Sequence, residues 1–370
     1  MPFGSEGVEA GIALALSGWG LRAALFHCGA LWRLNELGYL AKLNRISSVS
    51  GGSMTAGVLA VHWARLQFAN QVAINFLDEV VTPLRAFCAR SVDAPAIGEG
   101  ALLPWKSVSE AVEEEYRQHL YGDWTLHNLP DSPRFVFNAT NFGTGVDFRF
   151  SKPYAGDYRI GLIPNPSFRV SLAVTASSAF PPVLSPVIIK PDPVAFQRTE
   201  GADLYGQIEY RERLVLTDGG VYDNLGLETV WNRLETVLVS DAGAPFELNP
   251  DPGTAWHSQA LRAMDVATCQ ARGLRKRALI DDFQRQTRKG AYWGIMTEIA
   301  GYRLTDALPV PTSVTRELAS MRTRLNPFSE AEQARLINGG YALCDAAMRR
   351  FVLAAAALTP RWPYPAFALG

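Results

Sequence analysis

A serine among very small residues is the first feature of this sequence that could do chemistry. Ser50 lies in the stretch Ser-Val-Ser-Gly-Gly at residues 48–52, between the strand-like run Ile46–Val49 and apolar residues spaced as on one face of a helix. A serine on a sharp strand-to-helix turn exposes its hydroxyl, and the amides that open the helix favour negative charge beside it. The pattern therefore predicts a nucleophile at Ser50, although such turns also serve phosphate sites and ordinary connections.

The neighbours of Ser50 bear on this prediction. Gly51 and Gly52 supply the small side chains that such a turn tolerates. Ser53 is the competing nucleophile. We expect Ser53 in the first helical turn, where its hydroxyl would satisfy a free backbone amide.

A second stretch offers backbone amides rather than a side chain. Residues 10–17 are typical of a buried strand, and Gly18, Trp19 and Gly20 follow it, before a helix expected over residues 21–37. In an acyl hydrolase such a loop is the oxyanion hole, which stabilises the charge developing on a carbonyl oxygen. A phosphate loop or a plain tight turn gives the same pattern. A dinucleotide fingerprint does not, because Ala23 stands where the third glycine belongs.

Three aspartates are candidates for a general base. Asp218 follows a predicted strand at residues 214–216 and precedes Gly219 and Gly220. Ligands and catalytic groups collect at the carboxyl ends of strands in open α/β sheets, and a carboxylate held there can deprotonate a serine. The ordinary alternative is an Asp-Gly turn. Asp241 ends another predicted strand (236–240) and is the rival, while Asp223 is expected to bond a turn.

Composition excludes several classes of function. The 370 residues are 48% hydrophobic and 19% charged, which fits one large α/β domain with additions or two domains. A formal net charge of −1 gives no electrostatic case for nucleic acid. The four cysteines are scattered and histidine is rare, so neither disulfides nor a zinc site is indicated, and no acidic loop resembles a calcium site. We expect no metal, no cofactor, reduced cysteines and a cytoplasmic location.

Contact with membranes is expected to be peripheral. The N-terminus lacks the basic run of a signal peptide, and no stretch reaches about 18 uninterrupted apolar residues. Basic clusters at residues 272–277 and 285–289 are ordinarily solvated faces, with anionic headgroups as the alternative ligand. The aromatic stretch 291–296, which contains Trp293, would line an acyl groove or pack in the interior.

The remaining elements are predicted from the periodicity of apolar residues and from the glycine and proline residues that interrupt it. They are a helical region over 57–90, a cap or insertion over 91–130 with a helix at Glu110–His119, a strand at 134–141, a strand end and small-residue helix over 170–180, an edge strand at 184–190, a largely helical region over 255–300, and a helix over 329–353 in which Gly339-Gly340 marks a kink or close approach.

Four ordered motifs resemble the patatin-like phospholipase family. Residues 17–22 (SGWGLR) resemble its glycine-rich oxyanion motif, 48–52 (SVSGG) its serine box, 173–181 (AVTASSAFP) its small-residue segment, and 218–220 (DGG) its aspartate box. The resemblance implies an α/β fold, a three-layer α/β/α sandwich with a central, mostly parallel sheet. It divides the chain into a catalytic domain at 1–250 and a mainly helical C-terminal extension at 251–370 packed on the same domain.

The resemblance also implies a mechanism. Ser50 and Asp218 would form a catalytic dyad that needs no histidine, so His27 is read as packing or supporting, and His257 as unmarked. Gly18, Trp19 and Gly20 would form the oxyanion hole. The supporting residues of these motifs would be Arg22, Gly51, Gly52, Gly219 and Gly220. The substrate would be a lipid or phospholipid ester, with the oligomeric state undetermined.

Two departures from the family pattern keep alternatives open. Trp19 replaces a central glycine in a turn that favours positive φ, which would narrow the oxyanion hole or place an aromatic wall at its entrance. Ser48 replaces the first glycine of the serine box, a mild change. A carboxylesterase of short acyl esters and a catalytically silent lipid- or partner-binding member are the alternatives to a phospholipase.

Overall fold

The computed structural model describes residues 7–90, 107–323, 326–353 and 358–370. The strands are β1 (Glu9–Leu16), β2 (Leu43–Val49), β3 (Phe68–Ala69), β4 (Val72–Ala73), β5 (Arg134–Asn141), β6 (Val146–Ser151), β7 (Tyr154–Asp157), β8 (Gly161–Pro164), β9 (Val187–Ile189), β10 (Leu214–Asp218), β11 (Leu234–Asp241) and β12 (Lys289–Gly294).

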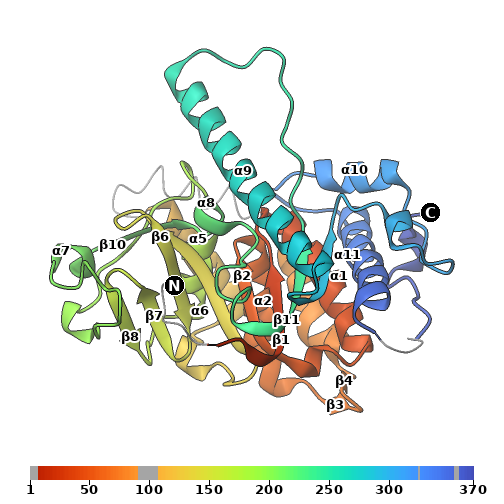
Figure 1. Ribbon diagram of the computed structural model, residues 1–370, viewed down its shortest axis with the longest axis horizontal. Coiled ribbons are helices and arrows are strands. Elements are labelled where there is room, and N and C mark those ends of the chain that lie inside the picture. Colours follow the sequence, from red (N-terminus) through yellow and green to blue (C-terminus); the bar gives the residue numbers. More distant parts are fainter. Residues whose placement is uncertain (1–6, 91–106, 324–325, 354–357) are drawn as a thin grey trace.

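Helices cover both faces of the strands (Figure 1). The α-helices are α1 (Gly20–Glu36), α2 (Gly51–His62), α3 (Thr82–Cys88), α5 (Val108–Tyr116), α6 (Val170–Ser178), α7 (Glu209–Glu212), α8 (Gly220–Asp223), α9 (Trp256–Gln284), α10 (Thr312–Ser320) and α11 (Glu330–Phe351). Two π-helical turns, Leu77–Val81 and Arg117–Tyr121, precede α3 and follow α5.

One sheet holds all the strands except the β3–β4 hairpin. Its order is β12-β11-β1-β2-β5-β6-β7-β8, and β12 through β5 are parallel to one another. From β5 onward the sheet is antiparallel, and β10 and the edge strand β9 join it on β5. The fold is therefore the α/β/α sandwich with a mostly parallel sheet that the motifs predict.

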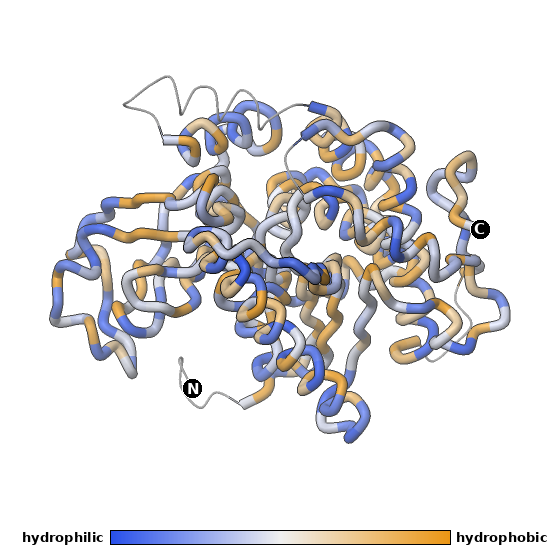
Figure 2. The backbone as a smooth tube through the Cα atoms, turned by 90° about the horizontal axis from the view of Figure 1, so that it is seen from above, coloured by the Kyte–Doolittle hydropathy of each residue, from blue (hydrophilic) through white to orange (hydrophobic). Residues whose placement is uncertain are grey.

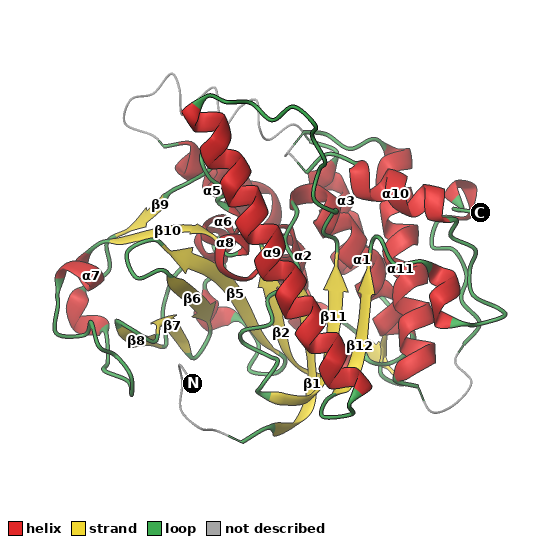
Figure 3. Cartoon of the chain, turned by 45° about the horizontal axis from the view of Figure 1, so that its top comes forward, coloured by secondary structure: helices red, strands yellow, loops and turns green. Residues whose placement is uncertain are grey.

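The strand β1 shows how the sequence builds the layers. Leu14 and Leu16 belong to the large core beneath α1, α2 and α11, whereas Ala13 and Ala15 face the smaller core beneath α9. Alternate residues of a strand point to opposite faces, so this leucine–alanine alternation specifies a sheet covered on both sides. Figure 3 shows α9 crossing one face while α1 and α11 cover the other, and in Figure 2 the central strands are largely hydrophobic.

The first and last long helices pack directly against each other, as the red α1 and the blue α11 show in Figure 1. A Cβ on Gly29 or on Gly340 would overlap a backbone oxygen of the opposite helix, so the two axes approach closely only because both residues are glycine. The buried Arg33 of α1 also pairs with Asp345 of α11 at 2.7 Å. The glycine pair at 339–340 thus marks a close approach rather than a kink.

Several predicted elements are confirmed and three are wrong. The strands at 10–17, 134–141, 184–190, 214–216 and 236–240 and the helices at 21–37 and 329–353 are present within a few residues. The helical region at 57–90 is interrupted by the β3–β4 hairpin. The segment 170–180 contains no strand end, since α6 starts at Val170. The region 255–300 contains β12, which extends the parallel sheet.

The predicted insertion at 91–130 falls partly on residues 91–106, which lie outside the described residues. Its helix is α5, which begins after Ser107 with reciprocal bonds between Ser107 and Glu110. The division of the chain at residue 250 stays a prediction. Because β12 extends the sheet and α11 packs on α1, both parts contribute to the same core.

Candidate active site

The ends of two strands meet on one edge of β5. β2 pairs with β5 in parallel as far as Val49 opposite Asn138. β10 pairs with the rest of that edge in the antiparallel direction and ends with Asp218 opposite Ala139. The two strands therefore run toward each other, and their last residues take adjacent positions along β5. This topology brings Ser50, the residue after β2, beside Asp218.

The turn at Ser50 is strained and tightly packed. Ser50 has φ 52° and ψ −120°, a conformation that residues with a side chain rarely adopt. Its N–H is held by Ser177 at the end of α6, at 3.1 Å from the carbonyl oxygen and 3.0 Å from the hydroxyl. A Cβ on Gly51 or Gly52 would overlap the backbone where β1 leads into α1. Close packing thus accounts for the small residues of the serine box.

Asp218 is buried beside Ser50. Its carboxylate accepts a hydrogen bond from the Gly220 N–H at 2.7 Å, and the Ser50 hydroxyl is the side-chain donor close to it. Burial raises the pKa of Asp218 to about 7, against the opposing effect of these two donors. No cation of the described chain forms an ion pair with it. A carboxyl group with a pKa near 7 can exchange a proton at neutral pH.

The glycines after Asp218 serve the same junction. The Gly219 N–H donates to the Ser177 carbonyl at 3.2 Å, so Ser177 ties the residues after both strands together. A Cβ on Gly219 would overlap the carbonyl oxygen of Asn138 in β5. Only glycine fits this close contact.

Two helices begin beside Ser50. α1 starts at Gly20 and α2 at Gly51, and a Cβ on Gly51 would lie 2.9 Å from the Gly20 nitrogen. Each helix carries partial positive charge and free N–H groups at its N-terminus. The two N-termini therefore converge where a substrate oxygen attached to Ser50 would carry negative charge.

The backbone N–H groups of the three predicted oxyanion residues are not equally free to bind a substrate oxygen. Gly18 is next to Ser50, but its N–H donates to the Asn224 carbonyl at 3.0 Å. The N–H groups of Trp19 and Gly20 form no hydrogen bond within the described residues. Available donors are thus the amides of residues 19 and 20.

Trp19 occupies a backbone conformation that suits glycine. Its φ is 101°, and its ring lies 5.5 Å from the Arg22 guanidinium and 5.8 Å from that of Arg272. These cation–π contacts hold the indole in the strained loop. The departure from the family pattern at Trp19 is therefore accommodated by two arginines.

Arg22 joins the loop to the C-terminal part of the chain. Its guanidinium donates to the carbonyls of Ala319, Met321 (2.8 Å) and Ala242 (3.2 Å). Burial, with the nearby charge of Arg272, lowers the pKa of Arg22 to about 10. A Cβ on Gly20 would overlap the Thr323 carbonyl, so residues 319–323 lie against this loop. Arg22 thus holds the loop by contacts with backbone carbonyls.

The competing serine is fully buried. The Ser53 hydroxyl donates to the Ser48 hydroxyl at 2.9 Å and lies 2.8 Å from that of Ser177. The prediction that Ser53 satisfies a backbone amide is wrong, because its partners are hydroxyl groups. Ser48 in turn donates to the Val136 carbonyl at 3.3 Å, so it is accommodated in place of the family's glycine.

The rival carboxylates have structural partners. Asp241 accepts hydrogen bonds from Arg272 (2.8 Å) and from the Tyr292 hydroxyl (2.6 Å). Although burial acts to raise it, these donors hold the pKa of Asp241 below its usual value. Asp223 accepts N–H bonds from Leu225 and Glu228, as expected of a carboxylate that bonds a turn.

Neither candidate histidine is placed to act as a base. His27 is fully buried, with Nε2 donating to the Ser17 carbonyl at 2.9 Å and Nδ1 accepting from the Ser240 hydroxyl at 2.8 Å. Burial lowers the pKa of His27 to about 4, so the ring is neutral. His257 is exposed in the first turn of α9. Within the described ranges, no group of three or more histidine, cysteine, aspartate and glutamate side chains could hold a metal ion.

Sequence reasoning missed two residues of this site. Ser177 clamps the two strand ends, and its signal was the small-residue segment at 173–181. Asn224 binds the Gly18 N–H through its carbonyl, and its side-chain Oδ1 is buried without a hydrogen-bond partner among the described residues. A turn residue five positions after a DG motif carries no such signal by itself.

Comparison with known families decides the identity of the fold. A family model described as patatin-like phospholipase matches residues 14–231, more than half of the chain, and this range contains Ser50, Asp218 and the loop at 18–20. The chain belongs to the patatin-like phospholipase family. No curated protein matches the sequence.

Solved structures agree with this family at the level of the fold. Human GIVD cytosolic phospholipase A2 is similar with a TM-score of 0.52 and 15% identity, over 92% of this chain and 61% of that chain. The same human protein in complex with methyl gamma-linolenyl fluorophosphonate gives a TM-score of 0.53 and 16% identity, over 92% and 58%. This chain thus spans about three-fifths of the length of these patatin-fold relatives. None of the helices described here is both long and apolar enough to cross a bilayer.

Proposed function

We propose that this chain is a serine acyl hydrolase that cleaves lipid acyl esters with Ser50 and Asp218 as a catalytic dyad. The observation that carries the proposal is the position of Ser50 beside the buried Asp218 carboxyl group, whose pKa burial raises to about 7. This contact lies where two helix N-termini converge. In this proposal Ser50 is the nucleophile, Asp218 is the base, and the helix N-termini stabilise negative charge.

The proposed reaction has two halves. Asp218 takes the hydroxyl proton as Ser50 Oγ bonds to the ester carbonyl carbon, and it gives that proton to the alcohol when the ester C–O bond breaks. A water molecule then loses a proton to Asp218 and attacks the acyl-serine, releasing the fatty acid and restoring the Ser50 hydroxyl. Asp218 is therefore an ionised carboxylate at the start and at the end of each half.

The negative oxygen of both intermediates needs donors. We assign this role to the N–H groups of Trp19 and Gly20 and to that of Gly51, the residue after the nucleophile. Gly18 then supports the loop through its bond to Asn224. Loss of one such donor typically costs about 2.7–4 kcal/mol of transition-state stabilisation.

The family supports the substrate class that we propose. Patatin-like phospholipases and the human cytosolic phospholipase A2 carry the activity in their names, and the human enzyme has been solved with a linolenyl fluorophosphonate. We therefore favour phospholipase A or lysophospholipase activity over a short-chain carboxylesterase.

A fluorophosphonate with a long alkyl chain tests the nucleophile. We expect one covalent adduct, located on Ser50 by peptide mass spectrometry, in the wild type and in Ser53→Ala, and none in Ser50→Ala. Ser50→Ala should also lose about 10⁴-fold or more of the ester hydrolysis rate. An adduct on Ser53 would contradict the assignment. A folded wild type that takes no adduct and cleaves no ester from acetyl to palmitoyl would favour the silent lipid-binding member.

We also propose peripheral contact with a lipid surface, at the projecting end of α9. Three side chains that the sequence suggested for lipid contact are not free to bind lipid. Trp293 is fully buried. Arg272 pairs with Asp241, and Arg275 pairs with Glu228 at 3.0 Å. The large apolar side chains Leu248 and Trp256 are instead 88% and 82% exposed. They lie near the N-terminal end of α9, which projects from the molecule in Figure 1.

Vesicle co-sedimentation tests this contact. The double variant Leu248→Ser, Trp256→Ser should reduce partitioning onto mixed phosphatidylcholine–phosphatidylglycerol vesicles by about tenfold or more, since burying each side chain in lipid contributes about 1.5–3 kcal/mol. Leu358→Ser, which removes an exposed leucine (69%) elsewhere, is the matched control and should have no effect. Equal partitioning of all three proteins would rule out this surface.

A further inference from the structure

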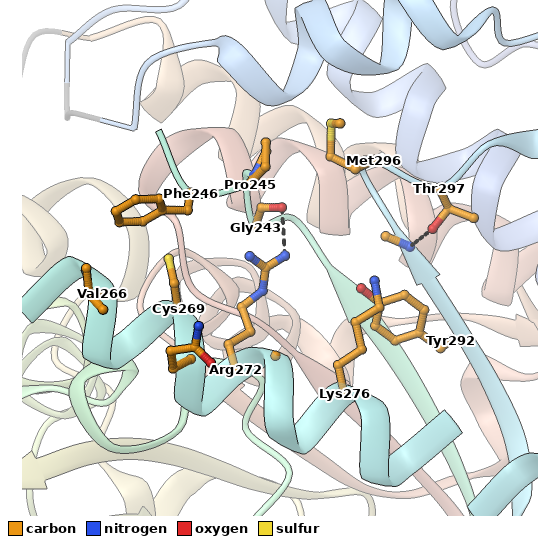
Figure 4. A pocket seen from close by; sticks show the side chains of 13 residues that line it. Gly243, Pro245, Phe246, Val266, Cys269, Arg272, Lys276, Tyr292, Met296 and Thr297 are labelled. Atoms are coloured by element: carbon orange, nitrogen blue, oxygen red, sulfur yellow. Dashed lines mark hydrogen bonds between the residues drawn. The ribbon is translucent and has the colours of Figure 1, made fainter. Parts of the chain in front are cut away.

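A cavity of about 640 Å³ lies between α9 and β12 (Figure 4). Its walls come from the loop after β11, from one face of α9, and from the end of β12 and the residues that follow. This volume is within the range of sites that bind small molecules. None of the residues assigned to catalysis lines it.

The strand order sets its relation to the proposed catalytic centre. β12, β11, β1 and β2 are successive neighbours, and their carboxyl ends lie along one edge of the sheet. At about 4.8 Å per strand, the cavity is about 10–14 Å from Ser50 along that edge. Arg272 contacts both regions, since it lines the cavity and its guanidinium lies 5.8 Å from the Trp19 ring.

The charged groups of the cavity do not balance. Arg272 has its donors engaged by Asp241 and by the carbonyls of Gly243 (2.7 Å) and Ala244 (2.8 Å). Asp241 is fully buried and its charge offsets that of Arg272. Lys276 forms no ion pair or hydrogen bond with any described residue. The charged groups that act on Lys276 are Arg272 and Asp241, which offset each other, so the positive charge of Lys276 has no partner among the described residues.

The Lys276 ammonium is held inside the cavity. Its Nζ lies 4.5 Å from the centre of the Tyr292 ring, a cation–π contact that keeps the side chain against β12. Burial lowers the pKa of Lys276, with Asp241 opposing and Arg272 adding to that shift. A bound anion would supply the missing partner.

The other walls are apolar. Phe246, Val266 and Met296 line the cavity, and Phe246 is held in place by Arg262, whose guanidinium lies 4.0 Å from its ring. The thiol of Cys269 is uncharged, because burial raises its pKa. A ligand for this cavity therefore needs one negative group and an apolar body.

We propose that this cavity is a binding site for an amphiphile with a single negative charge, whose carboxylate or phosphodiester group pairs with Lys276 and whose apolar part lies against Phe246, Val266 and Met296. A fatty acid and the headgroup region of an anionic phospholipid share this chemistry. The site does not depend on Ser50 chemistry.

Calorimetric titration of the 370-residue Ser50→Ala protein tests the site without turnover. The probes are octanoate, octanamide as its neutral match, and dihexanoyl-phosphatidylglycerol below its micelle concentration. We expect at least one anion to bind and octanamide to bind at least about tenfold more weakly than that anion, a difference of about 1.4 kcal/mol. Octanoate alone would identify a fatty acid site and the phosphodiester alone a headgroup site.

Variants locate the binding. Lys276→Met keeps the length of the side chain and should weaken anion binding at least about tenfold, whereas Lys276→Arg should restore it. Val266→Glu, at a half-exposed wall position (44%), should abolish it by repulsion. Arg277→Met removes the exposed neighbouring cation and should change nothing. Failure of both anions to bind, equal binding of octanamide, or unchanged affinity in Lys276→Met would overturn the proposal. The fluorophosphonate result at Ser50 is independent of each outcome.

Discussion

Replacing Asp218 with asparagine should lower kcat/KM for an ester substrate by about 10²–10⁴-fold while the protein stays folded. The asparagine amide fills nearly the same volume and its oxygen still accepts the Gly220 N–H, but it cannot take the Ser50 proton. Reaction with the fluorophosphonate should slow in parallel. Hydrolysis of a chromogenic ester under steady-state conditions measures the effect, and a variant that keeps more than about a tenth of the activity would rule out Asp218 as the base.

The pH dependence of wild-type kcat/KM also tests whether Asp218 is the base. Only the ionised carboxylate accepts a proton, and the pKa of Asp218 is raised to about 7, chiefly by burial. kcat/KM should therefore rise with pH through about 7 and level off above it. A profile that is flat between pH 5 and pH 8 would contradict this assignment.

Stability should change in the opposite direction from activity. Because the folded-state pKa of Asp218 lies above the ordinary value of 3.8, the folded protein keeps a proton that the unfolded chain releases. The free energy of unfolding consequently falls as pH rises from about 4 to 7, by about 4 kcal/mol at most for this group. Asp218→Asn removes that cost, so at pH 8 the variant should be at least as stable as the wild type.

Asp241→Asn is the matched control. It also replaces a buried aspartate at the end of a strand, but its partner Arg272 would be left without a counter-charge. Breaking one side of a buried ion pair typically costs about 3–5 kcal/mol. Denaturant unfolding at pH 8 should therefore separate the two variants. Equal losses of stability would mean that Asp218 is also held by ionic contacts.

The parts of the site that the sequence predicted are local in sequence. Ser50 and Asp218 each stand directly after a strand, next to glycines whose close contacts admit no side chain. Strand, turn and helix follow one another within a few residues, so their pattern is sufficient to predict the turns. That β10 runs antiparallel to β5 and meets β2 end to end is a property of the sheet, which no local pattern contains.

The wrong predictions around α9 and β12 have a common physical origin, which is burial between segments distant in sequence. Residues 289–294 (KGAYWG) are flanked by helical segments and have no alternation of polar and apolar residues, yet they form β12, where Ala291 and Trp293 are buried beneath helices. A strand covered on both faces resembles a buried helix in composition. The same burial explains why Trp293 was a poor candidate for lipid contact. The ion pairs of α9 were equally unpredictable, since Asp241 and Glu228 are 31 and 47 residues away from their arginines.

A single methyl group at Gly340 should have the largest effect on stability. In Gly340→Ala the new Cβ would overlap the Phe26 carbonyl oxygen and lie 2.8 Å from its carbon, and both atoms belong to the backbone of α1. The helices would have to separate, which would open the core between them. We expect a loss of more than about 3 kcal/mol in the free energy of unfolding, because backbone in a packed interface cannot yield as a flexible side chain does.

The matched substitution on α9 should act in the other direction. In Gly273→Ala the Cβ meets only the end of the Arg277 side chain, at 3.8 Å, and alanine is favoured over glycine in a helix by about 1 kcal/mol. Denaturant unfolding of both variants measures this difference in stability.

The same two variants should also differ at the site. α1 supplies Gly20 and Arg22 to the loop beside Ser50, so separation of α1 from α11 should reduce fluorophosphonate labelling of Gly340→Ala and leave Gly273→Ala unaffected. Wild-type stability and labelling in Gly340→Ala would show that α11 is dispensable to the site, and would favour a catalytic unit that ends near residue 250.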